Sequence, residues 1–293
     1  MKKRTLRKTE PYLWIAPSIV LMAIFIVVPI FSVFRTAFSE VSKSGLIKGF
    51  NGVDNFVKVL SNPDFALVLK NTLVWTIFVV VLSTVLGFIL ALLLNNNFRG
   101  RKIARAIVVF PWATTLVVQA SIWTFIINTD FGTLNTLLRT LGIIETNINW
   151  TPTPEAWFAW EIACGIFVTI PFVCFTALSG LQGIDSSYYE AATVDGANYW
   201  QKLFHITIPL VKPSLTVATV LNIIYVFNSF PIIWTMTKGA PAHKTDTLVT
   251  YLYTLAFYNG KRGEAAAVSV IGFLILLACA SVYMVSTLKK GDE

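Results

Sequence analysis

Six long apolar segments, separated by polar stretches, dominate the hydrophobic pattern of the chain. Each is long enough to cross the roughly 30 Å of hydrocarbon in a bilayer as a helix. Helices are expected rather than open strands, because an open strand leaves its backbone groups unsatisfied in lipid. The pattern therefore predicts an all-α integral membrane protein with six transmembrane helices. The segments are residues 12–34, 71–94, 103–127, 162–181, 214–234 and 265–288.

Four prolines fall inside these segments: Pro29, Pro111, Pro171 and Pro231. A proline removes one backbone N–H and crowds the preceding turn. In a membrane helix the freed carbonyl is commonly satisfied by a neighbouring helix or by a Ser or Thr side chain. We therefore expect each predicted span to continue through its proline.

The composition supports the membrane class. Of the 293 residues, 55% are hydrophobic and 13% are charged, whereas soluble domains carry about a quarter charged residues. A soluble protein of this size could not cover its surface with so few charged groups. The net charge of +8 does not indicate nucleic-acid binding, because basic residues are expected on the cytosolic face of a membrane protein.

Lysine and arginine are densest in the N-terminal tail and in the second connection between spans. Such residues gather in the cytosol, so both termini and the loop 183–213 are predicted to be cytosolic. We expect a basic tail with the first span over residues 1–35, an extracellular loop over 36–70 and a core domain over 71–288. The first span is longer than the apolar core of a signal peptide, so it is expected to be retained. The basic residues are Lys2, Lys3, Arg4, Arg7, Lys8, Arg99, Arg101, Lys102, Arg105, Lys202, Lys212, Lys289 and Lys290.

The predicted cytosolic loop contains a compact, charged segment, YYEAATVDGANYWQKLFHITIP, at residues 188–209. Ser187 and Glu190 have the spacing of a capping box and predict the start of a helix. Gly196 suits a left-handed stop at the end of that helix. The segment is therefore expected to turn sharply at this glycine.

A second short helix is expected after the glycine, with Trp200, Leu203 and Phe204 on one face. Pro209 and Pro213 are expected to break the chain before the fifth span. The spacing alone leaves two interpretations open. The segment is either a hairpin that joins two spans at the membrane surface or a module that docks on a soluble partner.

The same segment resembles the EAA signature of the membrane subunits of ABC importers. The signature reads E-A-A, three residues, G, nine residues, I-x-I-P, and the fuller form E-A-A-x-x-D-G-A is also present. Stretches such as NFVKVLSNPDF, FPWATTLVVQASIW and FNSFPIIWTMTKGAP are similar to the carbohydrate branch of that family, the maltose- and glycerol-phosphate-type permeases. The resemblance covers nearly the whole chain and implies the membrane-subunit fold of type I importers, in its compact six-span form.

The resemblance also implies partners. The segment would dock on a cytosolic ATPase subunit, which binds ATP and Mg, whereas this chain itself would carry no cofactor, metal or catalytic residue. A second homologous permease in a heterodimer, two ATPase subunits and an extracellular substrate-binding protein are expected, in a bacterial or archaeal plasma membrane. The implied coupling residues are Glu190, Ala191, Ala192, Asp195, Gly196, Ala197, Phe204 and Pro209.

Polar and aromatic residues within the fourth and fifth spans form a candidate sugar site. Tyr225, Asn228 and Ser229 stand at i, i+3 and i+4, so they are predicted to share one helix face. An aromatic ring beside an amide and a hydroxyl suits a sugar, although ordinary helix packing is the alternative interpretation from the residues alone. In the resembled family, positions matching these spans line the sugar pathway. The predicted substrate-binding residues are Thr169, Phe172, Tyr225, Val226, Asn228 and Ser229.

An ion-coupled secondary transporter is the alternative function. Such a protein normally needs carboxylates deep within its spans and often shows inverted repeats. No Asp or Glu lies in the centre of the second, third, fifth or sixth segment, and no repeat is apparent. Glu161 is interpreted as an ordinary boundary carboxylate beside Trp157 and Trp160.

A membrane enzyme is the third hypothesis. His205 and His243 are predicted to lie on opposite sides of the membrane, so they cannot form one site. Cys164, Cys174 and Cys279 lie inside apolar runs without the close spacing of a zinc site, so they are expected to be packing residues. No G-x-x-x-x-G-K-[ST] phosphate loop is present, so ATP chemistry must belong to a partner.

Overall fold

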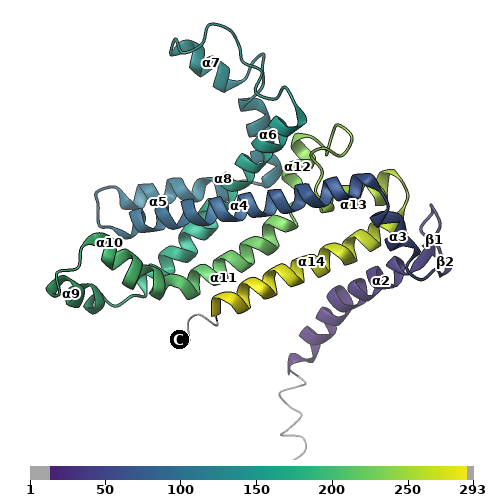
Figure 1. Ribbon diagram of the computed structural model, residues 1–293, viewed down its shortest axis with the longest axis horizontal. Helices are drawn as coiled ribbons and strands as arrows, with labels where there is room; N and C mark the ends of the chain where they lie inside the picture. Colours follow the sequence, from purple (N-terminus) through teal and green to yellow (C-terminus); the bar gives the residue numbers. More distant parts are fainter. Residues whose placement is uncertain (1–13, 289–293) are drawn as a thin grey trace, which may run out of the picture. The chain divides into compact units, whose positions relative to one another are not determined.

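The chain folds into helices that follow its apolar segments (Figure 1). The computed structural model describes residues 14–288. The basic residues of the N-terminal tail, together with Lys289 and Lys290, lie outside the described residues. The described chain divides into two compact units, one comprising the chain up to Pro63 with Leu252–Phe273, the other comprising Asp64–Tyr251 with the chain from Leu274 onward.

The predicted all-α membrane class is confirmed. Among the described residues, five helices are long and apolar enough to cross a membrane, and a bent pair supplies a sixth span if it is counted as one. The five are Trp14–Ala37, Pro63–Asn95, Pro154–Gln182, Tyr199–Met236 and Arg262–Val285. The last of these belongs to α14, which runs over Arg262–Leu288.

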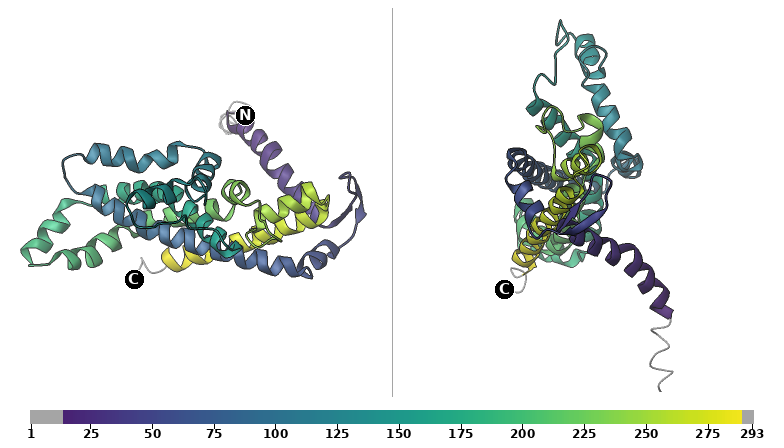
Figure 2. Two further views of the ribbon diagram at one scale, coloured as in Figure 1. Left: turned by 90° about the horizontal axis from the view of Figure 1, so that it is seen from above. Right: turned by 90° about the vertical axis from the view of Figure 1, so that its right-hand side faces the viewer.

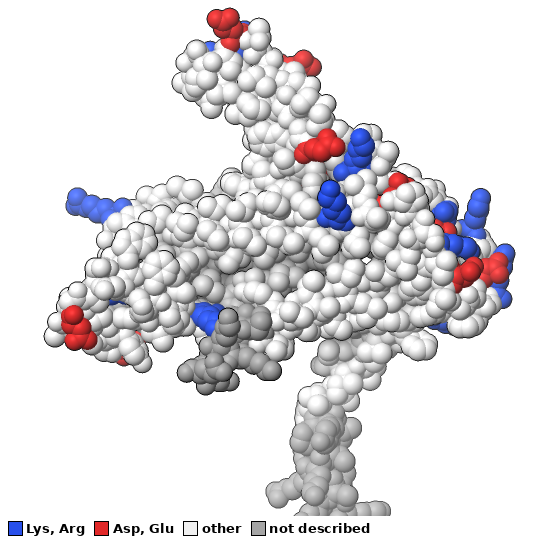
Figure 3. Space-filling view, in the orientation of Figure 1, with Lys and Arg blue, Asp and Glu red and all other residues white. Residues whose placement is uncertain are grey.

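Three long helices build the core of the second unit: α4 (Pro63–Asn95), α8 (Pro154–Gln182) and α11 (Ile208–Phe227). Helices α8 and α11 pack along each other more extensively than any other described pair (Figures 1 and 2). On the face shown in Figure 3, the charged atoms of this unit gather near its ends, and the helical surface between them is uncharged. This distribution is what a lipid-facing surface requires.

Buried side chains in this unit form two clusters along the helices. Trp75, Val168 and Ile233 belong to one cluster, and Cys174 and Val211 belong to the other. Cys164 and Cys174 are therefore buried, as expected of packing residues, whereas Cys279 is exposed. Burial of apolar groups between helices lets them contact one another in place of lipid chains.

Two glycines set the distance between helices α4 and α8. A Cβ added at Gly165 of α8 would stand 2.7 Å from the indole of Trp75, and one added at Gly87 of α4 would stand 2.8 Å from Cβ of Val173. Contacts this short leave no room for a side chain. The helices approach closely because these positions carry none, as is common in membrane interiors.

The predicted third span is not one straight helix. Helix α5 (Arg101–Val109) passes through the 3-10 turn η2 (Phe110–Ala113) and stops, and α6 (Leu116–Ile126) leaves at an angle of 97°. Figure 1 shows this change of direction. The helix runs through Pro111 as far as Ala113, so the proline is tolerated as expected, and the span is interrupted after Ala113 instead.

Local side chains explain this bend. Thr114 has an extended backbone, and the hydroxyl of Thr115 caps α6 by accepting from the Val118 amide at 3.3 Å. The buried side chain of Gln119 donates to the carbonyl of Pro111 at 3.0 Å. The carbonyl that would face lipid after a helix break is thus satisfied within the protein.

The fifth span begins earlier than predicted. Helix α10 (Tyr199–Lys202) passes through the π-turn η3 (Leu203–Thr207) directly into α11. Pro209 directly follows the π-turn in this continuous helical stretch, and Pro213 lies inside α11. The predicted break at these prolines is wrong.

The fifth span is interrupted near its end. Helix α11 stops at Phe227, and α12 (Pro231–Met236) follows after residues 228–230. Pro231 stands in the first turn of the new helix, so it begins a helix rather than lying inside one. In α8, by contrast, Pro171 is accommodated within a continuous helix, as predicted.

The first unit contains the first membrane helix and the short elements that follow it. The π-turn η1 (Ala23–Val27) leads into α2 (Val28–Ala37), whose first turn contains Pro29. Strands β1 (Ser39–Val41) and β2 (Ile47–Phe50) form an antiparallel hairpin, followed by α3 (Asp54–Leu60). The buried side chain of Asn55 donates to the carbonyls of Ala37 and Ser39, both at 2.9 Å. One amide therefore ties α3 to the end of α2 and the start of the hairpin.

The remaining connections contain short helices. Helix α7 (Thr133–Thr140) lies in the connection between α6 and α8. The amide of the buried Asn135 donates to the carbonyls of Thr129 and Ile148 and accepts from the Trp150 indole at 3.0 Å. Helix α13 (Leu248–Tyr253) and the π-turn η4 (Thr254–Tyr258) precede α14.

Replacing Gly165 by alanine tests the close approach of α8 and α4. The new methyl group would meet the Trp75 indole at 2.7 Å, and overpacking of this kind costs about 1–3 kcal/mol. Gly165→Ala should therefore lower the thermal unfolding temperature of the purified protein in detergent. Gly49→Ala, where an added Cβ meets nothing within 4 Å, is the control. An unchanged or higher unfolding temperature for Gly165→Ala would contradict this account of the packing.

Candidate functional site

The EAA segment forms two short helices joined by a glycine elbow. Helix α9 (Ser186–Val194) is followed by Gly196 with φ of +75° and then by α10. A left-handed residue favours glycine because other side chains crowd the backbone there. The predicted left-handed stop at Gly196 is confirmed.

The start of α9 differs from the prediction. The carboxylate of Asp185 accepts from the Ser187 amide at 2.9 Å and caps the helix, so the predicted capping box of Ser187 and Glu190 is wrong. This hydrogen bond to the charged form lowers the pKa of Asp185. A capping box does occur in α10, where Asn198 accepts from the Gln201 amide and the Gln201 side chain accepts from the Asn198 amide.

The outer surface of this segment is unusually exposed for a helical pair. No residue of α9 is buried, and Val194 is 89% exposed. The rings of Trp200 and Phe204 stack with centroids 6.3 Å apart and are both exposed. Leu203 points inward and is buried, so the prediction that it shares one face with Trp200 and Phe204 is wrong.

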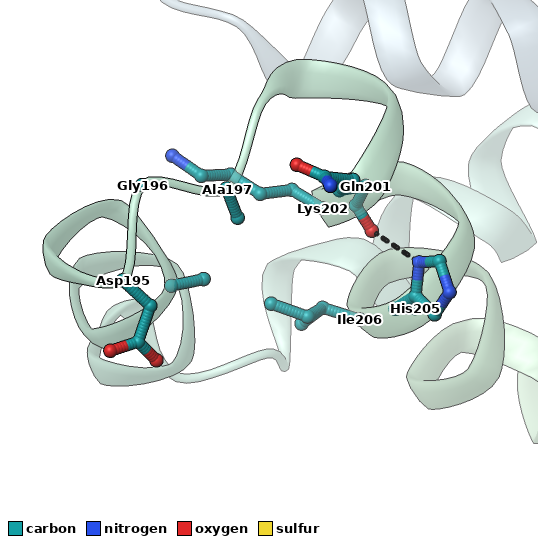
Figure 4. Close-up of a pocket in the computed structure, with 8 residues that line it drawn as sticks. Asp195, Gly196, Ala197, Gln201, Lys202, His205 and Ile206 are labelled. Atoms are coloured by element: carbon teal, nitrogen blue, oxygen red, sulfur yellow. Dashed lines mark hydrogen bonds between the residues drawn. The ribbon is translucent and has the colours of Figure 1, made fainter.

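A shallow hollow lies inside the elbow (Figure 4). A ring nitrogen of His205 lies 3.0 Å from the carbonyl of Gln201 at its rim. A Cβ built at Gly196 would meet no atom of this chain within 4 Å. The hollow is lined by Ala192, Asp195, Gly196, Ala197, Gln201, Lys202, His205 and Ile206.

Two hydrogen bonds connect the two halves of the elbow. The hydroxyls of Tyr189 and Thr207 lie 3.0 Å apart, and the Lys202 ammonium donates to the Thr193 hydroxyl at 2.7 Å. The first bond joins α9 to the π-turn that continues into α11. The first half of the elbow is therefore joined to α11 by a hydrogen bond and a continuous backbone.

A cavity of about 230 Å³ lies among η2, α8 and α11. The rings of Trp112 and Phe172 face each other with centroids 6.1 Å apart. Tyr225 is 46% exposed, and the Thr169 hydroxyl donates to the Gly165 carbonyl. The cavity has no charged residue in its lining, which consists of Trp112, Thr169, Phe172, Leu221 and Tyr225.

Three of the predicted sugar residues lie elsewhere. Val226 is buried in the core, and its carbonyl accepts from the Trp75 indole at 2.9 Å. Asn228 is exposed at the end of α11, where its amide donates to the Ile224 carbonyl at 2.8 Å. Ser229 is buried, and its hydroxyl has no described partner. The shared face predicted for Tyr225, Asn228 and Ser229 does not form, because α11 ends at Phe227.

Comparison with known proteins assigns the chain to a family. Residues 83–288 match the family model described as "Binding-protein-dependent transport system inner membrane component". This match includes the elbow and every residue that lines the cavity. The chain belongs to this family. The resemblance seen in the EAA segment is thereby confirmed, and the protein is a multi-pass transport permease.

Relatives of the permease match over nearly their full length. A probable ABC transporter permease protein of Brucella suis is 44% identical, and the match covers 94% of this chain and 96% of the relative. The trehalose/maltose transport system permease protein MalF of Thermococcus litoralis is 34% identical, with coverage of 93% and 92%. The permease also resembles a chain of a bacterial ABC transporter involved in alginate import, with a TM-score of 0.85, 22% identity and 98% coverage of both chains. The last likeness shows the fold.

Three residues of the permease that matter in these sites were missed from the sequence. Trp112 and Leu221 line the cavity, and Leu221 could have been found because it stands one turn before Tyr225. Glu161, interpreted as a boundary residue, is completely buried and accepts from the Thr237 hydroxyl at 2.7 Å. No spacing in the sequence links residues 161 and 237.

Proposed function

We propose that the permease forms the pathway for a saccharide in an ABC importer of the plasma membrane. The observation that carries this proposal is the uncharged cavity where Trp112, Phe172 and Tyr225 converge. Aromatic faces pack well on the C–H faces of sugar rings, and a few polar groups fix orientation. The trehalose/maltose permease among the relatives supports the same substrate class.

The α9–α10 elbow is the docking site for a separate ATPase in this proposal. A helix with no buried residue gains stability when a partner covers it, and the exposed Trp200 and Phe204 rings offer apolar contact beside the charged groups of Glu190 and Asp195. ATP and Mg are bound by that ATPase. The permease sequence contains no phosphate-binding loop of its own, which supports this division of roles.

A second permease subunit is the proposed neighbour of the first membrane helix. None of the most apolar part of Trp14–Ala37 is buried by the described chain, so its surface is open to lipid or to a partner. We propose a heterodimer with a homologous permease, two ATPase subunits and an external substrate-binding protein. The family description, which specifies binding-protein-dependent transport, supports the last of these partners.

The elbow is proposed to face the cytosol, together with both termini. Asn95 and Asn96 lie beside Tyr199 and Lys202 of the elbow. The basic residues that follow them, including Arg99, Arg101 and Lys102, support this orientation through the preference of Lys and Arg for the cytosolic side. The 237–247 loop, between α12 and α13, would then lie outside.

Ion-coupled transport is less well supported. Glu161 is the buried carboxylate that such a mechanism could use. Its side chain, however, accepts a hydrogen bond from Thr237, and it does not line the cavity. We therefore place the source of energy in the ATPase.

Removing an aromatic wall of the cavity tests the saccharide pathway. Phe172→Ala and Tyr225→Ala should each weaken saccharide uptake roughly fivefold, because each loses a stacking contact of about 1 kcal/mol. Uptake is measured in proteoliposomes that contain the complete importer. Phe78→Ala, which removes a lipid-exposed ring of α4 that is 52% exposed, is the matched control. If both cavity variants transport at the control rate, the cavity is a packing defect and not the pathway.

Replacing the elbow glycine tests the docking site. Gly196 and Gly100 both have a left-handed backbone, with φ of +75° and +89°, and an added Cβ meets nothing at either position. Valine should therefore cost each about 1–2 kcal/mol of backbone strain. Only Gly196→Val should separate ATP hydrolysis from uptake and reduce uptake about tenfold or more, because only this position lies at the proposed interface.

The Gly100→Val variant is the control for strain. Both variants should reach the membrane in similar amounts, measured by quantitative immunoblotting of the membrane fraction. Full uptake by Gly196→Val, or equal losses for the two variants, would rule out the elbow as the coupling site.

A further inference from the structure

Two buried carboxylates hold the 237–247 loop. Of the charged side chains that the structure describes, Glu161 and Asp246 are the buried ones, at 0% and 1% exposure. Asp246 lies in the loop itself, and Glu161 reaches it from α8. A buried carboxylate is costly unless it is well bonded. Both carboxylates form hydrogen bonds with residues of this loop, so they help to determine its conformation.

Thr237 connects Glu161 to two other residues of the loop. Its hydroxyl donates to Oε1 of Glu161 at 2.7 Å and lies 2.6 Å from the Thr245 hydroxyl. It also accepts from the Gly239 amide at 3.2 Å. The single hydroxyl hydrogen of Thr237 is used in the bond to Glu161. In the contact between the two threonines, the Thr245 hydroxyl is therefore the donor and the Thr237 oxygen is the acceptor. One carboxylate oxygen thereby orients a chain of hydroxyls at the base of the loop.

The backbone of the loop is unusual. Lys238, Ala242 and His243 have φ of 56°, 49° and 61°, a region that side chains other than glycine rarely occupy. Such conformations persist where surrounding contacts impose them. The carboxylate of Asp246 provides one such contact, because it lies 2.5 Å from Nδ1 of His243 and occupies the space that a Cβ at Gly239 would need. Burial raises the pKa of Asp246.

Helix α4 fixes the other end of the loop. The side-chain amide of Asn71 donates to the carbonyls of Lys244 and Asp246, at 2.9 Å and 3.2 Å. The Leu248 amide donates to the Thr72 hydroxyl at 2.8 Å. The base of the loop, which includes Thr245 and Asp246, is therefore buried and bonded on two sides.

The tip of the loop is presented to solvent. The residues Lys238, Ala240, Pro241, Ala242 and Lys244 are exposed. Neither Lys238 nor Lys244 forms an ion pair with a described carboxylate. Two unpaired ammonium groups on a fixed backbone suit a partner surface that carries carboxylates.

We infer that Glu161 is a positioning residue, which acts through Thr237 to hold the tip of the 237–247 loop in one shape for docking of the substrate-binding protein. The inference rests on the proposed function for the identity of the docking partner. A fixed tip loses less conformational freedom when it binds, which increases affinity without adding a contact. Glu161 itself touches no partner.

The first experiment tests the positioning role without any partner protein. The intact permease complex is treated with trypsin, and the rates of cleavage after Lys238 and Lys244 are measured. Glu161→Leu and Thr237→Val, which remove the hydrogen bond, should raise these rates about tenfold. Glu161→Gln and Thr237→Ser, which keep an acceptor and a hydroxyl, should stay within about twofold of the original protein.

The controls separate a local effect from unfolding. Glu145→Leu changes an exposed carboxylate in the connection between α7 and α8 and should leave cleavage unchanged. Basal ATP hydrolysis should be the same in all variants that fold. If Glu161→Leu does not fold, Thr237→Val carries the test alone. The positioning role would be overturned if folded Glu161→Leu and Thr237→Val were cleaved at the rate of the original protein. It would also be overturned if Glu161→Gln were cleaved as fast as Glu161→Leu.

The second experiment tests docking. The concentration of substrate-binding protein that gives half of the maximal ATP hydrolysis should rise about tenfold in Thr237→Val, while the maximal rate stays the same. Faster cleavage together with unchanged docking would overturn the assignment of the loop to this partner, as would cross-linking of the tip to the second permease. If no binding protein stimulates the unmodified complex, the proposed function fails, and the cleavage experiment still decides the role of Glu161.

Discussion

A bilayer offers no water to backbone N–H and C=O groups, so the protein itself must satisfy every break in a membrane helix. Two helices of the permease are interrupted, at residues 114–115 and 228–230, and side chains donate hydrogen bonds to carbonyls beside these interruptions. Gln119 donates to Pro111, and the Trp75 indole donates to Val226. The aromatic residues Trp112 and Tyr225 stand beside these breaks, so the cavity depends on helices that can end within the protein without exposing their backbones to lipid.

The ends of the second unit differ in polarity from the helical surface between them. On the face shown in Figure 3, that surface is uncharged, and the elbow and the 237–247 loop of this unit carry the polar groups discussed above. The elbow is an exposed helical pair that relies on a glycine to turn. The loop is an exposed tip on a buried, hydrogen-bonded base. Both present a defined backbone to a soluble partner, and both connect to the helices that line the cavity: the elbow through the π-turn into α11, and the loop through Glu161 to α8.

The sequence predicts most of the helices and the elbow, because hydrophobic length and the EAA spacing are local signals. Gly196 was predicted as a left-handed residue for the same reason. The bend after Pro111 was not predicted, because it depends on the extended backbone of Thr114 and on the cap that Thr115 gives α6, whereas Pro171 is accommodated within a continuous helix. The cap of α9 is Asp185, two residues before the predicted Ser187, because both residue types can cap a helix.

The roles predicted for the cavity and coupling residues remain predictions, although Thr169, Phe172 and Tyr225 do meet in one cavity. The bond between Glu161 and Thr237 joins residues far apart in the chain, and no local pattern encodes it.

Transport by the reconstituted importer tests the central claim most directly. The permease, a second permease and the ATPase are placed in liposomes with ATP inside, and the substrate-binding protein with a labelled oligosaccharide such as maltotriose is added outside. The account predicts that the sugar accumulates when ATP is present and that ionophores that collapse proton and sodium gradients leave this accumulation unchanged. Accumulation that needs an ion gradient and proceeds without ATP would contradict it.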